Sequence, residues 1–408
     1  MLSMNEALAR VLERAKPLPA VDCDLHAALG LALARDVVAD ADQPPFDKAL
    51  VDGFAVRSID LVDLPSRLDL GETILAGQTP QRPLGARQAA TITTGAPLPP
   101  GADAVVMHER TKRIGDAIEI EEHEIHPGLN RLPRGKVYRA GDRLLAAGAR
   151  INPAALGVLA AAGAASLRVF PRPRVAIVPT GDELVDFREV PGPGRIRNSN
   201  AIILGGLVDG LSSETWTSPI LGDDPQALKD GLRPALDFDV VLVMGGVSAG
   251  QKDLVPDTLQ ALDVEPIFHK IRIKPGKPLW FGVGPSNGDR PGPLVFGLPG
   301  NPLSVLVNFL VFVRPVLRIL AGASPNSDDR IEARLASRVS HRDTLTTHLP
   351  ARVLREPSAS GGPLRVEPVA WSGSADLLSA AIADGFLILP EGRETYEAGE
   401  IVGFLPLR

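Results

Sequence analysis

The sequence predicts an α/β multidomain protein, and three observations support this prediction. The chain has 408 residues, which is too long for one ordinary hydrophobic core. Strand and helix patterns alternate over about 150 residues in its middle, which is typical of a mostly parallel sheet covered by helices. Short β-prone runs separated by Pro and Gly turns lie on both sides of this region. We therefore expect a β-rich lobe before it and a small β-domain after it.

The N-terminal part combines helical and β-prone patterns. Apolar residues recur at helical spacing over residues 4–15 and 25–38, and Asn152 with Pro153 opens a further helix at 152–163. Runs at 89–94, 103–107 and 117–122 are typical of strands. We expect a discontinuous helical domain I at 1–40 and 141–170, interrupted by a β-rich domain II at 41–140.

The alternating region begins after residue 170. Strands are expected near 175–180, 215–220, 239–244 and 294–298, and helices at 200–211, 225–236, from about 253, and at 302–320. Ligands of such sheets bind beyond the carboxyl ends of the strands. We assign residues 171–322 to an α/β domain III. Shorter β-prone runs near 338–342, 349–354, 364–369 and 385–390 predict a β-rich domain IV at 323–408.

Composition and charge argue against several classes of function. A net charge of −6 is unlike a nucleic-acid-binding protein, which needs a basic face. The single Cys23 cannot form an internal disulfide or a Cys-based metal site, as expected in a reducing compartment. The charged N-terminus lacks an apolar signal core, and the longest apolar stretch is short and contains Asn308. We expect a cytoplasmic protein without nucleic-acid or membrane partners.

Three loops at expected strand ends carry polar groups beside glycines. "PTGDEL" contains Asp182 and Glu183, "GGVSAGQKD" contains Ser248 and Asp253, and "GLPGNPLSV" turns into a helix whose N-terminal amides should be free. Glycines let backbone amides approach an anion closely. Each loop alone could simply join a strand to a helix, but three in one sheet favour a binding site.

The segment "HKIRIKPGKP" adds cations to these loops. Strand alternation would place Lys270, Arg272 and Lys274 on one face, with Lys277 nearby. Charge-assisted hydrogen bonds contribute about 1.5–3 kcal/mol each, and charges beyond about 8 Å are largely screened. A local cluster therefore outweighs the overall negative charge. The alternative is an edge strand on which lysines deter aggregation.

Carboxylates recur in the predicted loops, and each alone could only solvate its loop. Beside a phosphate-binding loop, carboxylates are what Mg²⁺ needs, because it takes a few protein oxygens plus water and phosphate oxygens. The candidates are Asp52, Asp142, Asp182, Glu183, Asp223 and Asp253.

Ser248 lies in a Gly-x-Ser-x-Gly sequence, which raises the alternative of a serine hydrolase. A nucleophile elbow needs a sharp turn and an immediate helix, whereas this loop is long and the helical pattern begins only near Asp253. The candidate bases are His269, beside the lysine segment, and His341 and His348, both in the expected C-terminal domain. We favour Ser248 as part of an anion-binding loop.

Eight motifs in this order carry a resemblance to a known family: "VDGFAVR", "TTGAPLPPGADAVVM", "AGDRLLAAG", "VPTGDEL", "NSNAIILGGLV", "GGVSAGQKD", "IKPGKP" and "GLPGNPLSV". The chain resembles the molybdopterin molybdenumtransferases, the molybdenum insertases related to the C-terminal domain of gephyrin. The resemblance covers nearly the whole chain. It is weakest after residue 323, where "WSGSADL" is the main similarity.

The resemblance implies an elongated homodimer of four-domain subunits, with an α/β molybdopterin-binding domain III and a small β-barrel as domain IV. It implies a cleft between domain III of one subunit and domain II of the other, where adenylated molybdopterin and molybdate meet with Mg²⁺. The adenylate is hydrolysed, AMP leaves, and the dithiolene sulfurs take the metal. A molybdopterin adenylyltransferase and apo-molybdoenzymes would be partners. A non-catalytic molybdopterin-binding scaffold and a paralogue serving tungsten stay open.

The family's functional residues carry over motif by motif. The implied catalytic residues are Asp52, Asp142, Glu183, Asp223 and Asp253, of which Asp223 and Asp253 would also bind the metal. The implied substrate-binding residues are Thr94, Ser248, Lys270, Lys274, Lys277, Pro299, Pro302, Arg352 and Ser372. The transfers to Arg139, Arg352, Ser372 and Ser374 are looser because gaps interrupt the alignment. Two positions depart from the family pattern: Val51 stands where Met is commoner, and His108 where Gln is commoner.

Overall fold

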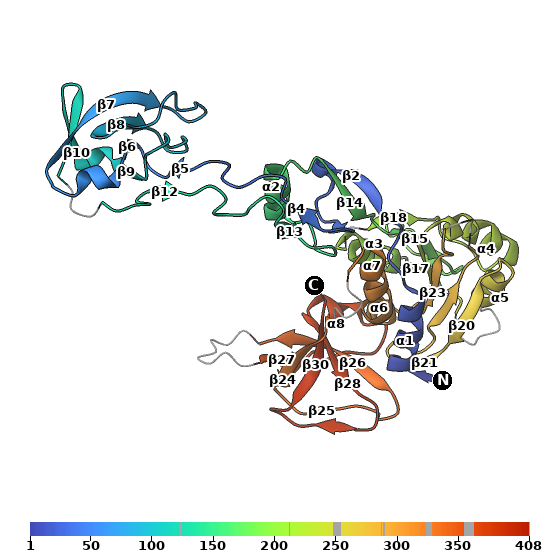
Figure 1. Cartoon of the computed structure of the whole chain (residues 1–408). Helices are drawn as coiled ribbons and strands as arrows, with labels where there is room; N and C mark the ends of the chain where they lie inside the picture. The colour runs from blue at the N-terminus through green and yellow to red at the C-terminus, as the bar shows by residue number, and fades with distance from the viewer. Residues whose placement is uncertain are drawn as a thin grey trace. The chain divides into compact units, whose positions relative to one another are not determined.

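The computed structural model describes residues 1–407 except 122–124, 212, 248–253, 287, 289, 324–328 and 355–362. The chain folds into two compact units (Figure 1). Unit 1 comprises Met1–Asp22, Gly30–Ala34 and Arg168–Arg408, and unit 2 comprises Cys23–Leu29 and Arg35–Leu167.

A six-stranded sheet forms the centre of unit 1. Its four parallel strands are followed by two strands paired antiparallel, in the order β18 (Glu214–Thr217), β15 (Arg174–Pro179), β19 (Val240–Met244), β23 (Leu294–Leu298), β22 (Trp280–Val283) and β20 (Glu265–His269). Every residue of β19 and β23 is buried, as expected where both faces of a parallel sheet are covered. The predicted, mostly parallel α/β sheet is confirmed.

Helices cover the two faces of this sheet. Along β19, Val240, Leu242 and Met244 belong to one core cluster, whereas Val241 and Val243 belong to another. The first cluster includes residues of α1 (Met4–Arg14), α3 (Asn200–Asp209), α6 (Pro302–Asn308) and α7 (Arg314–Leu320); the second includes residues of α4 (Pro225–Leu232) and α5 (Val255–Gln260). Alternate side chains along one strand thus hold both helix layers.

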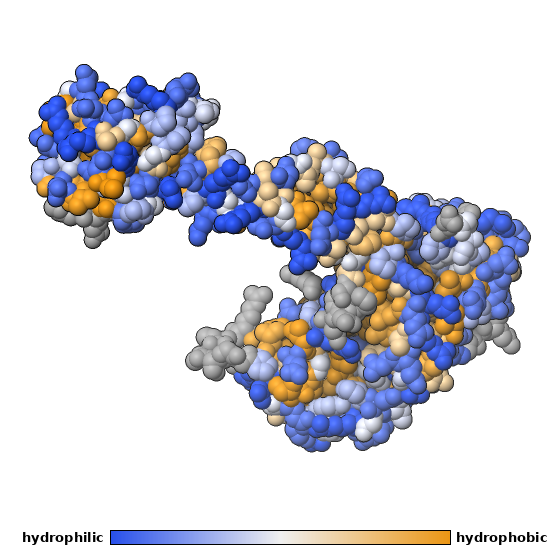
Figure 2. Space-filling view, in the orientation of Figure 1, coloured by the Kyte–Doolittle hydropathy of each residue, from blue (hydrophilic) through white to orange (hydrophobic). Residues whose placement is uncertain are grey.

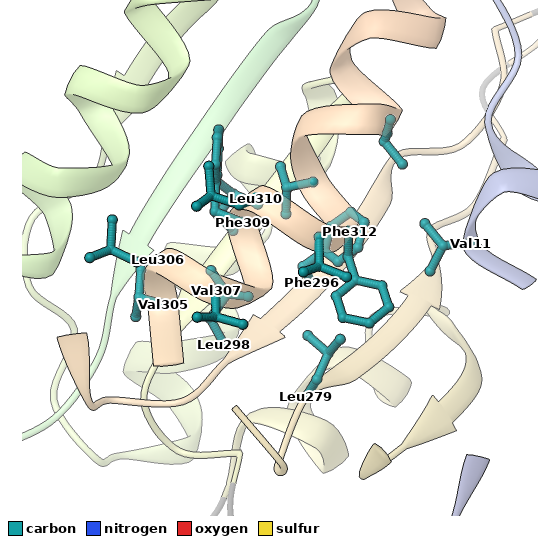
Figure 3. Packing of buried hydrophobic residues seen from close by; sticks show 14 of the residues in the cluster. Val11, Leu279, Phe296, Leu298, Val305, Leu306, Val307, Phe309, Leu310 and Phe312 are labelled. Atoms are coloured by element: carbon teal, nitrogen blue, oxygen red, sulfur yellow. The ribbon is translucent and has the colours of Figure 1, made fainter. Parts of the chain in front are cut away.

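The segment from α6 to α7 is the apolar centre of the first cluster. A π-helical turn, Phe309–Val313, joins the two helices. Figure 3 shows Phe309, Leu310 and Phe312 of this segment packed near Phe296 and Leu298 of β23. Pro302–Leu320 is long and apolar enough to cross a membrane, but 89% of it is buried inside the fold. It is therefore a core helix here, as the sequence predicts.

A small closed barrel follows the α/β sheet in unit 1. Its ring of paired strands is β26 (Thr346–Val353), β27 (Leu364–Pro368), β24 (Ile331–Leu335), β30 (Ile401–Pro406) and β28 (Gly385–Leu389), which pairs back to β26. Strand β21 (Ile271–Lys274) joins this sheet through β26 and pairs on its other side with β1 (Leu2–Ser3). Since β21 has a partner on each side, the edge-strand interpretation of the lysine segment is wrong.

Unit 2 contains the β-rich lobe. Its six-stranded sheet has the order β10 (Thr111–Ile114), β11 (Ala117–Ile120), β7 (Ser66–Ile74), β8 (Gln88–Ile92), β6 (Gly53–Val56) and β9 (Ala104–Met107). Phe54 and Val56 belong to one core cluster and Ala55 to another, so both faces of the sheet are covered. The pairing of β6 with β9 needs a glycine at position 53, because a Cβ there would lie 1.9 Å from the backbone oxygen of Val106.

The predicted helical domain I is only partly helical. Helices α1 and α2 (Pro153–Ala161) form as expected; a capping box of Ser3 and Glu6 begins the first, and Asn152 caps the second. The predicted helix at 25–38 is wrong. One 3-10 turn, Leu25–Ala27, is followed by Gly30 with φ +81° and by β3 (Ala32–Leu33), which pairs with β14 (Ser166–Phe170). The left-handed glycine and the strand pairing override the helical periodicity.

Polar and charged residues cover much of the visible surface of both units, with apolar patches between them (Figure 2). In unit 2, Ile59, Val62 and Val137 are among the exposed large apolar side chains. A subunit interface would cover such residues. The homodimer itself stays a prediction.

Candidate active site

Two adjacent strands of the unit 1 sheet end in carboxylates, which we call the acidic edge: Asp182 and Glu183 after β15, and Asp223 after β18. The backbone N–H of Asp223 donates to Oδ1 of Asp182 at 3.1 Å, and the N–H of Asp182 lies 3.5 Å from Oδ2 of Asp223. Each of the two carboxylates thus anchors the other loop through one oxygen. The structure brings Asp182 and Asp223 together at the predicted edge.

The turn before Glu183 requires a glycine. Gly181 has φ +133°, and a Cβ there would lie 2.4 Å from Oε2 of Glu183. Its N–H donates to the backbone oxygen of Leu221, which ties the two loops together at 3.0 Å. Side chains at positive φ are strained. The glycine therefore serves the turn that presents Glu183.

The acidic edge fits the protein side of a magnesium site. Mg²⁺ is usually bound through one or two carboxylates plus water and substrate phosphates, and Asp182 and Asp223 each use one oxygen in the contacts above. Within the described part of the chain, no group of three or more His, Cys, Asp or Glu side chains could hold a metal by itself. Asp253, the other predicted ligand, lies outside the described residues.

The lysine segment borders a pocket of about 490 Å³, which we call the lysine pocket. Lys274 and Lys277 contribute its cations, and Nζ of Lys274 lies 5.8 Å from the ring centroid of Trp371, a cation–π distance. The remaining lining residues are Ile273, Pro275, Gly276, Pro278, Pro299, Asn301, Ser304, Leu345, Gly373 and Ser374. The pocket thus lies between the lysine loop, the start of α6 and a barrel loop, and it suits a small anion.

A buried asparagine supports the lysine loop from behind. Asn308 is fully buried, and its Nδ2 donates to the backbone oxygen of Gly276 at 3.2 Å. Gly276 has φ +112°, and a Cβ there would lie 2.7 Å from Oδ1 of Asn308. That Oδ1 has no hydrogen-bond partner among the described residues. The loop between the two lysines therefore rests directly on the core helix.

The alternation predicted for Lys270, Arg272 and Lys274 is confirmed for the two residues within β21, whereas Lys270 precedes the strand with φ +69°. The two cations of β21 have different partners. Ile271 and Ile273 are buried, and Arg272 and Lys274 point away from the core. Arg272 forms a two-point ion pair with Glu391 at 2.8 and 3.1 Å, which raises the pKa of Arg272 and lowers that of Glu391. Arg272 is thus a structural residue, whereas Lys274 lines the pocket.

The expectation of free amides at the start of α6 needs correction. The N–H of Leu303 donates to the backbone oxygen of Ser374 at 3.0 Å, so the barrel loop occupies this amide. Pro302 has no N–H to donate, and Asn301 makes no side-chain cap. Ser304 remains at this end as a polar lining residue of the pocket.

Of the other predicted binding residues of unit 1, two prolines lie at the lysine pocket, whereas Lys270, Arg352 and Ser372 do not line it. Pro299 lines the lysine pocket, and Pro302 begins α6 beside it. Lys270 lies just before β21 with φ +69° and does not line the pocket. Arg352 pairs with Glu367 at 2.8 Å within the barrel. The N–H of Ser372 donates to Asp376 at 2.9 Å in the loop that supplies Trp371 and Ser374. Ser248 lies outside the described residues.

In unit 2, the structure brings together Asp52 and Thr94, two of the predicted site residues. The N–H and Oγ1 of Thr94 both donate to Oδ1 of Asp52, at 2.6 and 2.9 Å. These two hydrogen bonds, with a smaller contribution from His108, lower the pKa of Asp52. The His108 ring also meets Phe54 edge to face at 4.7 Å. The departure from the family pattern at 108 therefore lies close to the candidate carboxylate.

Asp142 has a structural contact in the same unit. Its Oδ2 accepts the N–H of Arg139 at 2.8 Å, and its own N–H donates to the Arg139 oxygen at 3.0 Å. These bonds close the turn before β13 (Arg143–Leu145). Its catalytic role stays a prediction from the resemblance.

The three histidines proposed for a hydrolase have other surroundings. Nε2 of His269 lies 2.8 Å from the backbone oxygen of Val247, which makes it a donor there. Nδ1 of His341 meets Oγ1 of Thr347 at 3.0 Å. His348 is fully buried in the barrel, and burial lowers its pKa to about 3. Ser248 lies outside the described residues, so the hydrolase alternative stays a hypothesis.

Sequence reasoning missed Asn308 and Trp371 as contributors to the lysine pocket. Asn308 had a signal, because it places an amide in the middle of a long apolar stretch. A buried amide needs a partner, and that partner proves to be the lysine loop. Trp371 opens "WSGSADL", the main similarity after residue 323, but that similarity pointed to Ser372 and Ser374 rather than to the indole.

Comparison with known families agrees with this geometry. The model of the MoeA N-terminal region (domain I and II) matches residues 2–163, and that of the MoeA C-terminal region (domain IV) matches residues 332–407. Between them, the model of a probable molybdopterin binding domain matches residues 176–319, which contain the acidic edge and the lysine segment.

Individual relatives cover nearly the whole chain. A molybdopterin molybdenumtransferase of Staphylococcus aureus is 31% identical over 409 residues, covering 99% of this chain and 95% of that protein. One from a Nostoc species is 38% identical over 304 residues, covering 73% of this chain and 69% of that protein. A crystal structure of a molybdopterin biosynthesis MoeA protein from Pyrococcus horikoshii has a TM-score of 0.84 and 31% identity, covering 100% of this chain and 99% of that one. The chain belongs to the MoeA family of molybdopterin molybdenumtransferases.

Proposed function

We propose that this protein is a molybdopterin molybdenumtransferase that acts in molybdenum cofactor biosynthesis in the cytoplasm. It would insert molybdate into adenylated molybdopterin, with hydrolysis of the adenylate and release of AMP. Family membership supports the insertion reaction. One observation carries the site assignment. Unit 1 contains both an acidic edge, which suits Mg²⁺, and a pocket lined by Lys274 and Lys277, which suits an anion.

The lysine pocket would bind the anionic groups of the substrates. Lys274 and Lys277 supply the charge, and Ser304 and Ser374 add polar groups to the same lining. Molybdate is a small oxyanion, and charge-assisted hydrogen bonds from ammonium groups are the strong kind. The aromatic wall of Trp371 keeps Lys274 in place through the cation–π contact.

The acidic edge would hold Mg²⁺ through Asp223 and Asp182, with Asp253 as the further predicted ligand. When bound, this ion would neutralise charge on the phosphoanhydride of the adenylate. Glu183 follows Asp182 in the same turn and is exposed, so it is available to orient a water molecule. AMP and the molybdopterin phosphate are then the two products of the hydrolysis.

In unit 2, Asp52 keeps its predicted catalytic role and Thr94 its predicted substrate-binding role. Two hydrogen bonds from Thr94 lower the pKa of Asp52, so the carboxylate is ionised at neutral pH.

The homodimer in which a partner subunit completes the site also stays a prediction. Light scattering on the purified protein would test it, and a monomeric mass at micromolar concentration would contradict it.

The central experiment mixes the purified protein with adenylated molybdopterin, Mg²⁺ and molybdate. AMP release is measured, and the product is detected by reconstituting an apo-molybdoenzyme. Molybdate-dependent turnover supports the transferase, and tungstate competition then tests the metal preference. Tight binding of the adenylate without turnover would instead indicate a non-catalytic scaffold.

Three substitutions separate this function from a serine hydrolase. Ser248→Ala should reduce AMP release only modestly, because Ser248 is proposed as one donor of an anion-binding loop. Asp253→Asn and Asp52→Asn should nearly abolish it. An equal collapse with Ser248→Ala would favour a nucleophilic serine.

A further inference from the structure

Unit 1 has a second pocket, which the proposed function does not use. It has a volume of about 380 Å³, within the usual range for small-molecule sites. We call it the basic pocket. Its cationic and anionic lining residues are Arg14, Lys16, Arg172, Arg174, Arg290, Glu214 and Asp239, and its apolar lining residues include Leu18, Pro171, Pro291, Leu294 and Leu320.

The basic pocket lies at the opposite end of the sheet from the acidic edge. Arg174, Glu214 and Leu294 are the first residues of β15, β18 and β23, and Asp239 directly precedes β19. The acidic edge follows the last residues of β15 and β18. A strand of five or six residues spans roughly 16–20 Å. A ligand here would therefore be separate from the candidate active site.

Asp239 fixes two of the arginines. Its Oδ2 accepts the backbone N–H of Arg174 at 2.7 Å and lies 3.8 Å from the Nε of that residue, and its Oδ1 accepts from Arg290 at 2.7 Å. The Asp239 side chain is only 11% exposed. Its charge is thus shared between two guanidinium groups, which leaves an excess of positive charge in a pre-organised place.

Two further lining cations, Arg14 and Lys16, come from the end of α1 and the segment after it. Neither Arg14 nor Lys16 has an ion-pair partner in the part of the chain that the structure describes. Arg14 lies in the last turn of α1, where a cation favours the helix dipole. Arg174 and Arg290 lie outside helices. The pocket gathers cations on a protein whose net charge is −6.

We propose that the basic pocket binds a small organic anion with an apolar body, of the class of aromatic phosphomonoesters or carboxylates. The cations would hold the anionic group, and the proline and leucine walls would cover the apolar part. The N–H of Leu18 donates to the backbone oxygen of Leu320 at 2.9 Å, so the segment after α1 is tied to the end of α7 and the pocket is formed before binding. This inference does not depend on the proposed function.

The test uses 1-naphthyl phosphate as the probe, with its fluorescence titrated against the full-length protein, and uncharged 1-naphthol as the ligand control. We expect saturable binding of the phosphate at one site and much weaker binding of naphthol. The double substitution Arg14→Gln with Lys16→Gln should raise the Kd of naphthyl phosphate at least about tenfold. Arg10→Gln removes an exposed charge from the same helix outside the pocket and should leave the Kd unchanged.

Two further variants assign the site. Pro291→Glu places a carboxylate at an exposed lining position and should also weaken binding. Lys274→Gln alters the lysine pocket and should leave the Kd of naphthyl phosphate unchanged. Melting temperatures confirm that each variant is folded. Absence of saturable binding, or binding that responds to Lys274→Gln but not to the Arg14 and Lys16 substitutions, would overturn the proposal.

Discussion

The lysine pocket and the acidic edge belong to the same unit but are held in different ways. Behind the lysine pocket lie buried groups: Asn308 supports the loop at Gly276, and Ile271 and Ile273 anchor the strand. The acidic edge instead consists of two exposed loops whose carboxylates accept each other's backbone N–H groups. Substitutions of the buried groups behind the lysines should therefore alter the lysine pocket, whereas at the acidic edge the carboxylates themselves and the Gly181 turn should matter.

The two regions are held differently because ammonium groups and carboxylates are fixed by different kinds of neighbours. An ammonium group on a flexible stem needs a fixed loop and an aromatic or apolar wall to lose little entropy on binding. A carboxylate can be fixed by backbone N–H groups of its neighbours. The predictions below test this contrast, beginning with the charge in the lysine pocket.

Among the substitutions that test this contrast, removing the charge at Lys274 should have the largest effect. Lys274→Gln loses a charge-assisted hydrogen bond worth about 1.5–3 kcal/mol, equivalent to a roughly 10- to 150-fold decrease in kcat/KM for AMP release. Lys274→Arg keeps the charge and should retain more activity. Lys136→Gln, at an exposed position of unit 2, is the matched control. A similar loss in the control would show that overall charge, not the pocket, matters.

Asp223→Asn should alter the magnesium requirement more than the fold. Asparagine Oδ1 can still accept the N–H of Asp182, so the loop contact is kept while the negative charge is lost. We expect the Mg²⁺ concentration for half-maximal activity to rise about tenfold or more, with an unchanged melting temperature. An unchanged magnesium dependence would remove Asp223 from the metal site.

Asn308→Leu tests the buried support of the lysine pocket. Leucine has a similar size but cannot donate to the Gly276 oxygen, and leaving this group unpaired costs about 1–3 kcal/mol of unfolding free energy. We expect a lower melting temperature and a several-fold higher KM for molybdate. Asn308→Gln can still donate and should restore part of the affinity. A variant that is less stable but has wild-type KM would show that Asn308 supports only the fold.

The sequence predicts the α/β sheet well because its strands are continuous apolar runs between helical patterns. It also places Asp223 in the loop after a strand of this sheet, where parallel topology brings loops together, and Lys274 on a strand that proves to join the barrel. It mispredicts residues 25–38, because periodicity contains no information about the strand partner Val169. It does not reveal that Ser374 occupies the Leu303 amide, since that contact joins the core helix to a distant barrel loop.

The barrel gives a last way to separate the two regions, because it supplies Trp371 and Ser374 to the lysine pocket but none of the acidic edge. His348, in strand β26, is fully buried, and neither ring nitrogen has a hydrogen-bond partner among the described residues. Burial, with a smaller contribution from Arg330, lowers the pKa of His348 from its usual 6.5 to about 3. The ring is therefore neutral in the folded barrel at neutral pH.

Acid should consequently destabilise the barrel through His348. Below pH 6.5 the unfolded chain binds a proton that the folded barrel excludes, so this stability is complete above pH 6.5 and is lost as the pH falls towards 3. The loss is at most about 1.4 kcal/mol per pH unit. Urea unfolding of the wild type and of His348→Leu, followed by tryptophan fluorescence, should show a smaller acid loss in the variant and equal activity at pH 7.5. Identical pH profiles would mean that His348 is accommodated as a cation.

If the acid effect is present, the affinity for molybdate should fall at a higher pH than the affinity for Mg²⁺, because only the lysine pocket depends on the barrel.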